Sequence, residues 1–105
     1  MKILALEKEV PGVSDNQFTE EILRAEARRA WELYQAGILR ELYFTADTRE
    51  AVLILECDSA DEARRHLAEL PLIRAELIDF RLIPLAPYPG FERLFALEDR
   101  PGRDG

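Results

Sequence analysis

The chain has 105 residues, of which 48% are hydrophobic and 33% are charged, and its formal net charge at pH 7 is -7. This length predicts one domain, and the composition excludes an intrinsically disordered chain. No apolar run approaches the roughly 18 residues that a transmembrane helix needs. No clustered basic face offers binding to nucleic-acid phosphates. We therefore expect a cytoplasmic globular protein that binds neither membranes nor nucleic acid.

The residue types that hold transition metals are scarce. Cys57 is the only cysteine, which excludes an internal disulfide and a thiolate cluster within one chain. His66 is the sole histidine, so no second histidine completes a zinc-type ligand set. We therefore expect no metal site.

The first part of the chain predicts a strand followed by a helix. Residues 2–9, which are apolar at positions 3–6, are predicted to form the strand. The helix begins after an N-cap at Ser14 or Thr19 and continues to about Ala36, where Gly37 supplies the left-handed C-terminal residue.

A hairpin follows. Residues 38–46 form its first strand, and residues 51–55 are apolar at five consecutive positions, which predicts a central strand buried on both faces. A polar loop of three residues, 47–49, joins them and places Leu42 opposite Ile54.

The second half repeats the helix and the strand. A capping box at Ser59 begins a helix over residues 59–70, which Pro71 ends. A fourth strand covers about residues 76–85. Residues 86–105 then form a proline-rich arm whose aromatic side chains need a surface to pack against, and its end, from residue 98, is expected to fray.

The order strand, helix, strand, strand, helix, strand predicts a ferredoxin-like α+β domain over residues 1–85, with both helices on one face of a four-stranded antiparallel sheet. Side-chain alternation assigns to the helix-covered face Leu4, Leu6, Leu53, Leu55, Ile78, Phe80 and Leu82. It assigns to the uncovered face Ile3, Ala5, Leu42, Phe44, Val52, Ile54, Leu77 and Ile83. Because both faces are apolar, we expect two sheets to stack in a homodimer; an open-faced monomer is the alternative.

Several segments of the second half share a family pattern: the strand end Leu55-Glu56-Cys57-Asp58, the helix 59–70, the junction Leu70-Pro71-Leu72, and the strand centre 77–80. Together they resemble the muconolactone isomerase family of dimeric α+β barrel proteins. The resemblance implies ferredoxin-like subunits paired into a barrel, sometimes in higher rings. It also implies a small-molecule pocket between sheet and helices, and cofactor-free proton transfer on an unsaturated lactone.

Glu26 is the candidate for that proton transfer. It lies within the apolar arc of the first helix, which consists of Leu23, Ala27, Ala30, Trp31 and Tyr34, extended by Ile22 and Leu33. Burial raises the pKa of a carboxyl group and suits it to general acid or base work. The alternative is that Glu26 forms an ion pair with Arg29 or with an arginine from the sheet or a neighbouring chain.

Other side chains are candidates to line the same pocket. Tyr43 and His66 are predicted as hydrogen-bonding or proton-relay groups, with Trp31, Tyr34 and Glu41 as substrate contacts. The alternatives are a histidine on the helix flank that pairs with Glu62, and aromatic rings that belong to the core.

A cluster of charges is predicted on the opposite sheet face. It consists of Arg40, Glu56, Asp79, Arg81 and Glu7, and the hairpin register places Arg40 across from Glu56. A salt-bridge network that fixes the sheet register is favoured over catalysis.

Two functions follow. The first is a cofactor-independent isomerase-like enzyme of small metabolites. The second is a small-molecule binding or assembly module without turnover. An open cavity that reaches Glu26 favours the enzyme, and a closed, fully packed layer favours the module.

Overall fold

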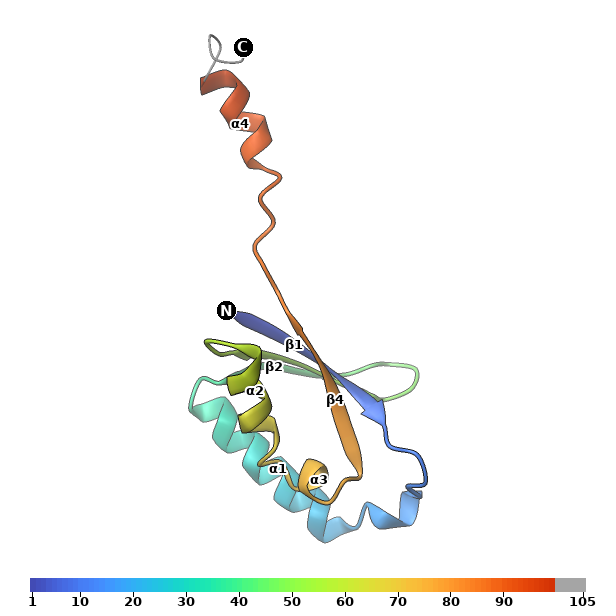
Figure 1. The fold of residues 1–105 in the computed structure, drawn as a ribbon. Coiled ribbons are helices and arrows are strands. Elements are labelled where there is room, and N and C mark those ends of the chain that lie inside the picture. The colour runs from blue at the N-terminus through green and yellow to red at the C-terminus, as the bar shows by residue number, and fades with distance from the viewer. Residues whose placement is uncertain (100–105) are drawn as a thin grey trace.

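The computed structural model describes residues 1–99 and confirms the ferredoxin-like α+β fold (Figure 1). Its single described sheet is antiparallel and has the order β2-β3-β1-β4, so the apolar strand β3 is central as predicted. The strands are β1 (Lys2–Glu9), β2 (Leu39–Phe44), β3 (Ala51–Glu56) and β4 (Ile78–Pro84). The helices are α1 (Glu20–Gln35), α2 (Ala60–Leu67), α3 (Pro71–Arg74) and α4 (Glu92–Asp99), with a short 3-10 helix at Asp15–Gln17.

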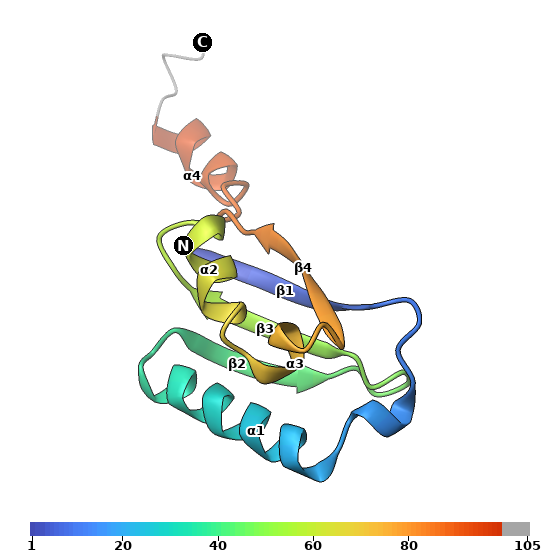
Figure 2. The same cartoon turned by 60° about the horizontal axis from the view of Figure 1, so that its bottom comes forward.

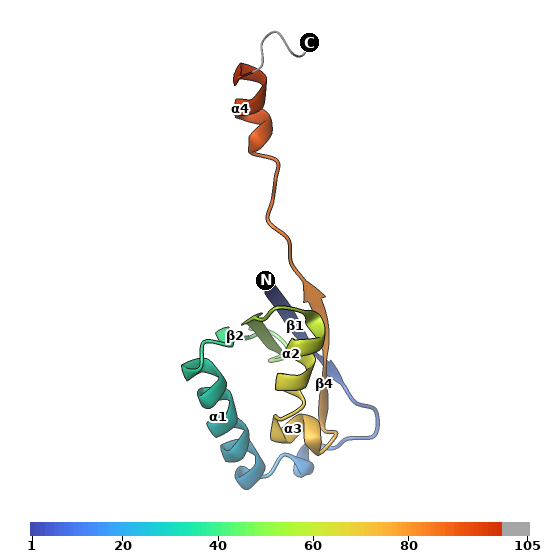
Figure 3. The same ribbon diagram turned by 60° about the vertical axis from the view of Figure 1, so that its left-hand side comes forward.

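Helices α1, α2 and α3 lie on the same face of the sheet (Figures 2 and 3). The predicted caps begin the two longer ones: the Thr19 side chain accepts from the backbone N–H of Ile22 at 3.2 Å, and Ser59 accepts from that of Glu62 at 3.1 Å. Pro71 was expected only to end a helix. The second helix, predicted over residues 59–70, instead ends at Leu67, before the proline is reached. Pro71 begins α3, because the first helical position does not need the N–H that proline lacks.

The hairpin register differs from the prediction by one residue. Leu42 lies opposite Leu53, not Ile54. The cause is the turn: Thr45 N–H donates to the carbonyl of Glu50 at 2.8 Å, so the loop has four residues rather than three, and Arg49 adopts a left-handed conformation with φ of 60°. A one-residue shift exchanges the two faces of a strand.

The predicted faces are therefore wrong for β2, and they are also wrong for β1. Ile3 pairs with Leu55 and Ala5 with Leu53, so these residues point toward the helices. The helix-covered face consists of Ile3, Ala5, Glu7, Leu39, Leu42, Phe44, Ala51, Leu53, Leu55, Ile78, Phe80 and Leu82. The uncovered face consists of Leu4, Leu6, Glu41, Tyr43, Val52, Ile54, Asp79, Arg81 and Ile83, and Leu77 is a buried core residue before β4.

The core lies between the sheet and the helices, and it corrects the predicted arc of α1. Leu33 is buried, with 2% of its surface exposed. Trp31 and Tyr34 are 57% and 48% exposed, and their rings stack on the outside of the helix with centroids 5.6 Å apart. The buried side of α1 is therefore centred near Leu33, which was predicted only as an extension of the apolar arc.

The chain after β4 leaves the body of the molecule (Figure 1). It continues as an extended segment and then as α4, which the sequence analysis did not predict, and the molecule reaches 67 Å along its longest axis. Exposed apolar side chains follow one another along this arm: Tyr88, Phe91, Leu94 and Phe95. Residues 100–105, most of the predicted frayed end, lie outside the described residues. Within the described part, no helix has the length and apolar character to cross a bilayer.

Candidate functional site

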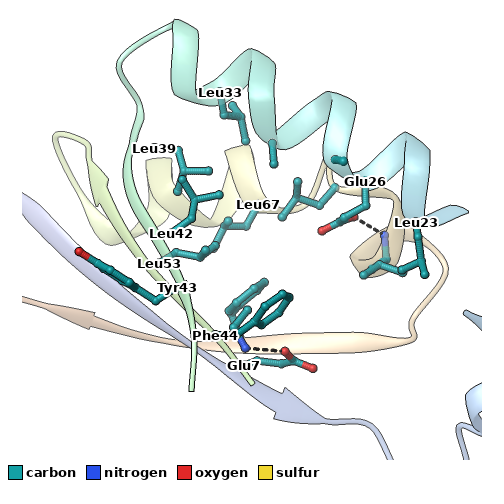
Figure 4. A pocket seen from close by; sticks show the side chains of 16 residues that line it. Glu7, Leu23, Glu26, Leu33, Leu39, Leu42, Tyr43, Phe44, Leu53 and Leu67 are labelled. Atoms are coloured by element: carbon teal, nitrogen blue, oxygen red, sulfur yellow. Dashed lines mark hydrogen bonds between the residues drawn. The ribbon is translucent and has the colours of Figure 1, made fainter. Parts of the chain in front are cut away.

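A cavity of about 360 Å³ lies between α1 and the sheet (Figure 4). This volume is at the lower end of the usual range for small-molecule pockets. Its wall is almost entirely apolar and is formed by Leu23, Ala27, Ala30, Leu33, Leu39, Leu42, Phe44, Ala51, Leu53, Leu67, Leu70, Leu72 and Phe80, together with Glu7, Glu26 and Tyr43. The layer between helices and sheet is thus open rather than fully packed.

Glu26 enters the cavity from α1 (Figure 4). Its Oε1 accepts a hydrogen bond from the backbone N–H of Leu72 at 2.9 Å. Burial raises the pKa of the Glu26 carboxyl, the nearby charge of Glu7 raises it further, and the Leu72 hydrogen bond opposes both effects. The structure therefore places this carboxyl on the side of the helix that its spacing predicted, in the environment expected of a general acid or base.

Glu7 is a second carboxylate in the cavity, although it was predicted to lie on the opposite sheet face. It enters from β1, and its Oε1 accepts from the backbone N–H of Ala51 at 2.7 Å. It follows Ile3 and Ala5 at the two-residue spacing of a strand, and both of those side chains are fully buried. This alternation would have placed Glu7 in the cavity if the face of β1 that points toward the helices had been assigned correctly.

Of the predicted alternatives for Glu26, the ion pair with Arg29 is wrong, whereas a pair with an arginine of a neighbouring chain stays a prediction. Arg29 forms salt bridges with Glu32, at 2.9 Å, and with Glu69. In the described part of the chain no salt bridge involves Glu26. Its carboxyl therefore faces the cavity without a compensating cation from residues 1–99.

Tyr43 borders the cavity, but its ring points away from it (Figure 4). The side chain is 58% exposed, and its hydroxyl donates to Oε1 of Glu41 at 2.8 Å. This hydrogen bond raises the pKa of Tyr43. Glu41 and Tyr43 were predicted to face the helices. The one-residue register shift places them on the uncovered side instead.

The other predicted pocket residues lie apart from the cavity. His66 Nε2 is 3.8 Å from Oε2 of Glu62, as in the alternative interpretation of a histidine on the helix flank. Trp31 and Tyr34 are on the outer surface of α1. Of the six residues predicted to share one pocket, the structure brings only Glu26 and Tyr43 to the cavity.

The predicted charge cluster is divided among local pairs. Glu56 binds the α-amino group of Met1 at 2.8 Å, and the bulge in β2 removes the expected pairing with Arg40. Asp79 lies 3.7 Å from Lys8 and 3.9 Å from Arg64. These exposed contacts are of the kind that contributes little to stability.

The fold and the cavity together define a class of protein: a small ferredoxin-like domain with helices on one face of its sheet and an acid-bearing apolar cavity between the two layers. The muconolactone delta-isomerase family model matches residues 3–90. The chain therefore belongs to the muconolactone delta-isomerase family, as the sequence pattern indicated.

Solved structures share the fold. A crystal structure of muconolactone isomerase aligns with a TM-score of 0.70 and 20% identity, covering 85% of this chain and 92% of that chain. A 5-chloro-2-hydroxyhydroquinone dehydrochlorinase from Burkholderia phenoliruptrix AC1100, in complex with 2,5-dihydroxybenzoquinone, aligns with a TM-score of 0.62 and 20% identity, covering 86% and 98%. Curated protein sequences give no match.

Proposed function

We propose that the protein catalyses cofactor-independent proton transfer on a small organic molecule, with Glu26 as the group that carries the proton. The observation that supports this most directly is a cavity of about 360 Å³ into which a half-buried carboxyl points, with its pKa raised by burial. Membership of the isomerase family agrees with it. The two structural relatives are enzymes whose names refer to small organic molecules.

For an unsaturated lactone, the reaction requires one group that removes and returns a proton. The Glu26 carboxylate takes a proton from the carbon γ to the carbonyl, and the C–H electron pair moves into a conjugated dienolate. The carboxylic acid so formed then protonates the α carbon, and the double bond is left between the β and γ carbons. One C–H bond is broken and one is formed, so the step is an isomerisation that leaves Glu26 unchanged.

The rival proposal, a binding or assembly module without turnover, was to be favoured by a closed and packed layer. The open cavity and the half-buried Glu26 carboxyl at its wall support the enzyme instead.

The test is exchange of substrate protons in D₂O. A panel of unsaturated lactones, charged and uncharged, is incubated with the protein, and deuterium incorporation is followed by NMR. We expect Glu26→Gln to lower the exchange rate by about 100- to 10,000-fold, the usual contribution of a general acid or base. Gln retains an oxygen that accepts from Leu72, so an unfolded variant is not expected. An unchanged rate would remove Glu26 from the mechanism.

We also propose that the chain pairs with a second copy of itself through the uncovered face of the sheet. Leu4, Leu6, Val52, Ile54 and Ile83 are aliphatic side chains of that face, and no described helix lies over them (Figure 3). Burying such a patch contributes roughly 25 cal/mol per Å². Stacked antiparallel sheets are a common way to achieve this.

The arm beyond β4 supports the same proposal. Its exposed aromatic residues, among them Tyr88 and Phe91, pack against each other edge to face at 5.2 Å but extend away from the body of their own chain. A partner subunit offers them a surface. Light scattering at micromolar concentration is expected to give the mass of two chains or a multiple of it, and the mass of one chain would contradict the dimer.

A further inference from the structure

The charges at the wall of the cavity have one sign. Glu7 and Glu26 are carboxylic acids, and none of the described residues that line the cavity is a lysine, arginine or histidine. We propose that the ligand of this cavity is an uncharged, largely apolar molecule, such as an enolisable lactone or ketone without a free carboxylate. The proposal names the substrate class of the function proposed above and rests on it for the reaction, although not for binding.

The backbone donors next to these carboxylates are already used. The N–H of Leu72 donates to Glu26 at 2.9 Å, and the N–H of Ala51 donates to Glu7 at 2.7 Å. A ligand carboxylate in the cavity would therefore compete with two resident carboxylates for the same donors. Like charges placed together beside an apolar wall repel each other, and no cation among the described lining residues compensates them.

Two arginines of neighbouring segments, Arg29 and Arg49, interact with other groups. Arg29 forms salt bridges with Glu32 of α1 and with Glu69 of the segment between α2 and α3. The guanidinium carbon of Arg49 lies 5.2 Å from the centroid of the Phe44 ring, but Arg49 is not a residue of the cavity wall. Neither arginine is therefore a residue of the cavity wall.

The remaining wall matches an apolar ligand. Leucine, alanine and phenylalanine side chains surround the space, and the two carboxyl groups enter from opposite layers, Glu26 from a helix and Glu7 from the sheet (Figure 4). Such a wall would bind a compact ring by burial, with the Glu26 carboxyl directed at the acidic C–H group that is conjugated with the ring's carbonyl. The family is named for muconolactone, which carries a free carboxylate, so this chain is expected to differ from that specificity.

The test uses two probes that differ in charge: muconolactone and its methyl ester. Binding to the full chain is measured by NMR titration of labelled leucine methyl groups at pH 7. We expect the ester to bind at least about tenfold more tightly than the acid, since like-charge contacts are costly. In the double variant Glu7→Gln and Glu26→Gln, the affinity for the acid is expected to rise toward that of the ester. Glu41→Gln, which removes an exposed charge on the other sheet face, is the matched control and should leave the difference intact.

Each outcome decides the proposal. It is overturned if the free acid binds as tightly as the ester, if neither compound binds at millimolar concentration, or if the double variant leaves the difference unchanged. Each single variant is measured as well, so that poor folding of the double variant does not remove the comparison. Deuterium exchange of the bound ester separates the two proposals. Binding of the ester without exchange contradicts proton transfer alone, whereas binding and turnover of the acid contradict the uncharged ligand alone.

Discussion

The Oε1 atom of Glu26 lies 2.9 Å from the backbone nitrogen of Leu72, a residue 46 positions later in the chain. This hydrogen bond joins α1 to the first turn of α3 and fixes the direction of the carboxyl group. One oxygen is held by the protein, and the other has no hydrogen-bond partner within residues 1–99. A carboxyl held in this way is oriented before a ligand arrives, which is a general requirement of efficient proton transfer.

Replacing Glu26 should stabilise the protein at neutral pH. Because burial raises the pKa of this carboxyl in the folded state, folding disfavours the charged form. The resulting loss of stability develops as pH rises from the ordinary glutamate pKa toward the raised one, and it is complete above the raised value. We expect Glu26→Gln to increase the free energy of unfolding at pH 7 by about 0.5–2 kcal/mol. Substitutions at functional sites often stabilise a protein in this way, because such sites are not optimised for stability.

The measurement is urea unfolding as a function of pH. The gain should disappear below about pH 4, where the carboxyl is protonated in both states. Glu41→Gln, at an exposed position, is the control and should show no such gain. A larger benefit in acid than at neutral pH would contradict the assigned direction of the pKa shift.

The pH profile of turnover should depend on Glu7. Since Glu26 must be ionised to accept a proton, kcat/KM should rise through a pKa above the ordinary value for glutamate. Glu7→Gln removes a nearby negative charge, and the rise should then occur at lower pH. The displacement should be smaller than the whole shift, because burial is the larger cause. A profile that moves to higher pH in Glu7→Gln would show that the two carboxyls do not interact as described.

The two sides of α1 should respond differently to truncation. Leu33 is 2% exposed, and Leu33→Ala should lower the free energy of unfolding by about 2–5 kcal/mol through the lost contacts and the cavity left behind. Trp31 is 57% exposed, and Trp31→Ala should cost less than about 1 kcal/mol despite the larger side chain. Chemical denaturation of both variants checks the orientation of the helix. Equal losses would contradict it.

The uncovered sheet face should control assembly. Ile54 is opposite Leu4 at its centre, and Ile54→Arg places a charge where the partner sheet is proposed to pack. We expect this variant to have the mass of one chain by light scattering. Gln35→Arg adds the same charge on the exposed side of α1 and should leave the wild-type mass unchanged. Retention of the oligomer in both variants would show that another surface forms the contact.

The sequence was sufficient for features that depend on local pattern. Caps at Thr19 and Ser59, the apolar run of β3 and the order of elements specified the fold. The direction of Glu26 also followed from local information, because the angle between side chains on one helix is set by the helix itself.

Features that depend on pairing between distant segments were not predictable in the same way. Both alternating sets of β1 side chains are apolar, so Ile3 and Leu4 were equally suitable for the core, and the wrong choice removed Glu7 from the site. In β2, a turn with one more residue than expected reversed the positions of Leu42 and Tyr43. For the path of the arm away from the body and for the helix α4, the sequence holds no signal of comparable strength.

Arg49, whose backbone is in the left-handed conformation, lies in a turn that affects the ligand specificity of this fold. The four-residue turn that it closes determines which alternate side chains of β2 form the wall of the cavity. Shortening that turn by one residue would turn Leu42 and Phe44 away from the cavity and bring Glu41 and Tyr43 toward it. The cavity wall contributed by β2 would then become polar without any substitution in the strand. A change in the length of a surface loop could therefore alter which class of ligand the cavity binds.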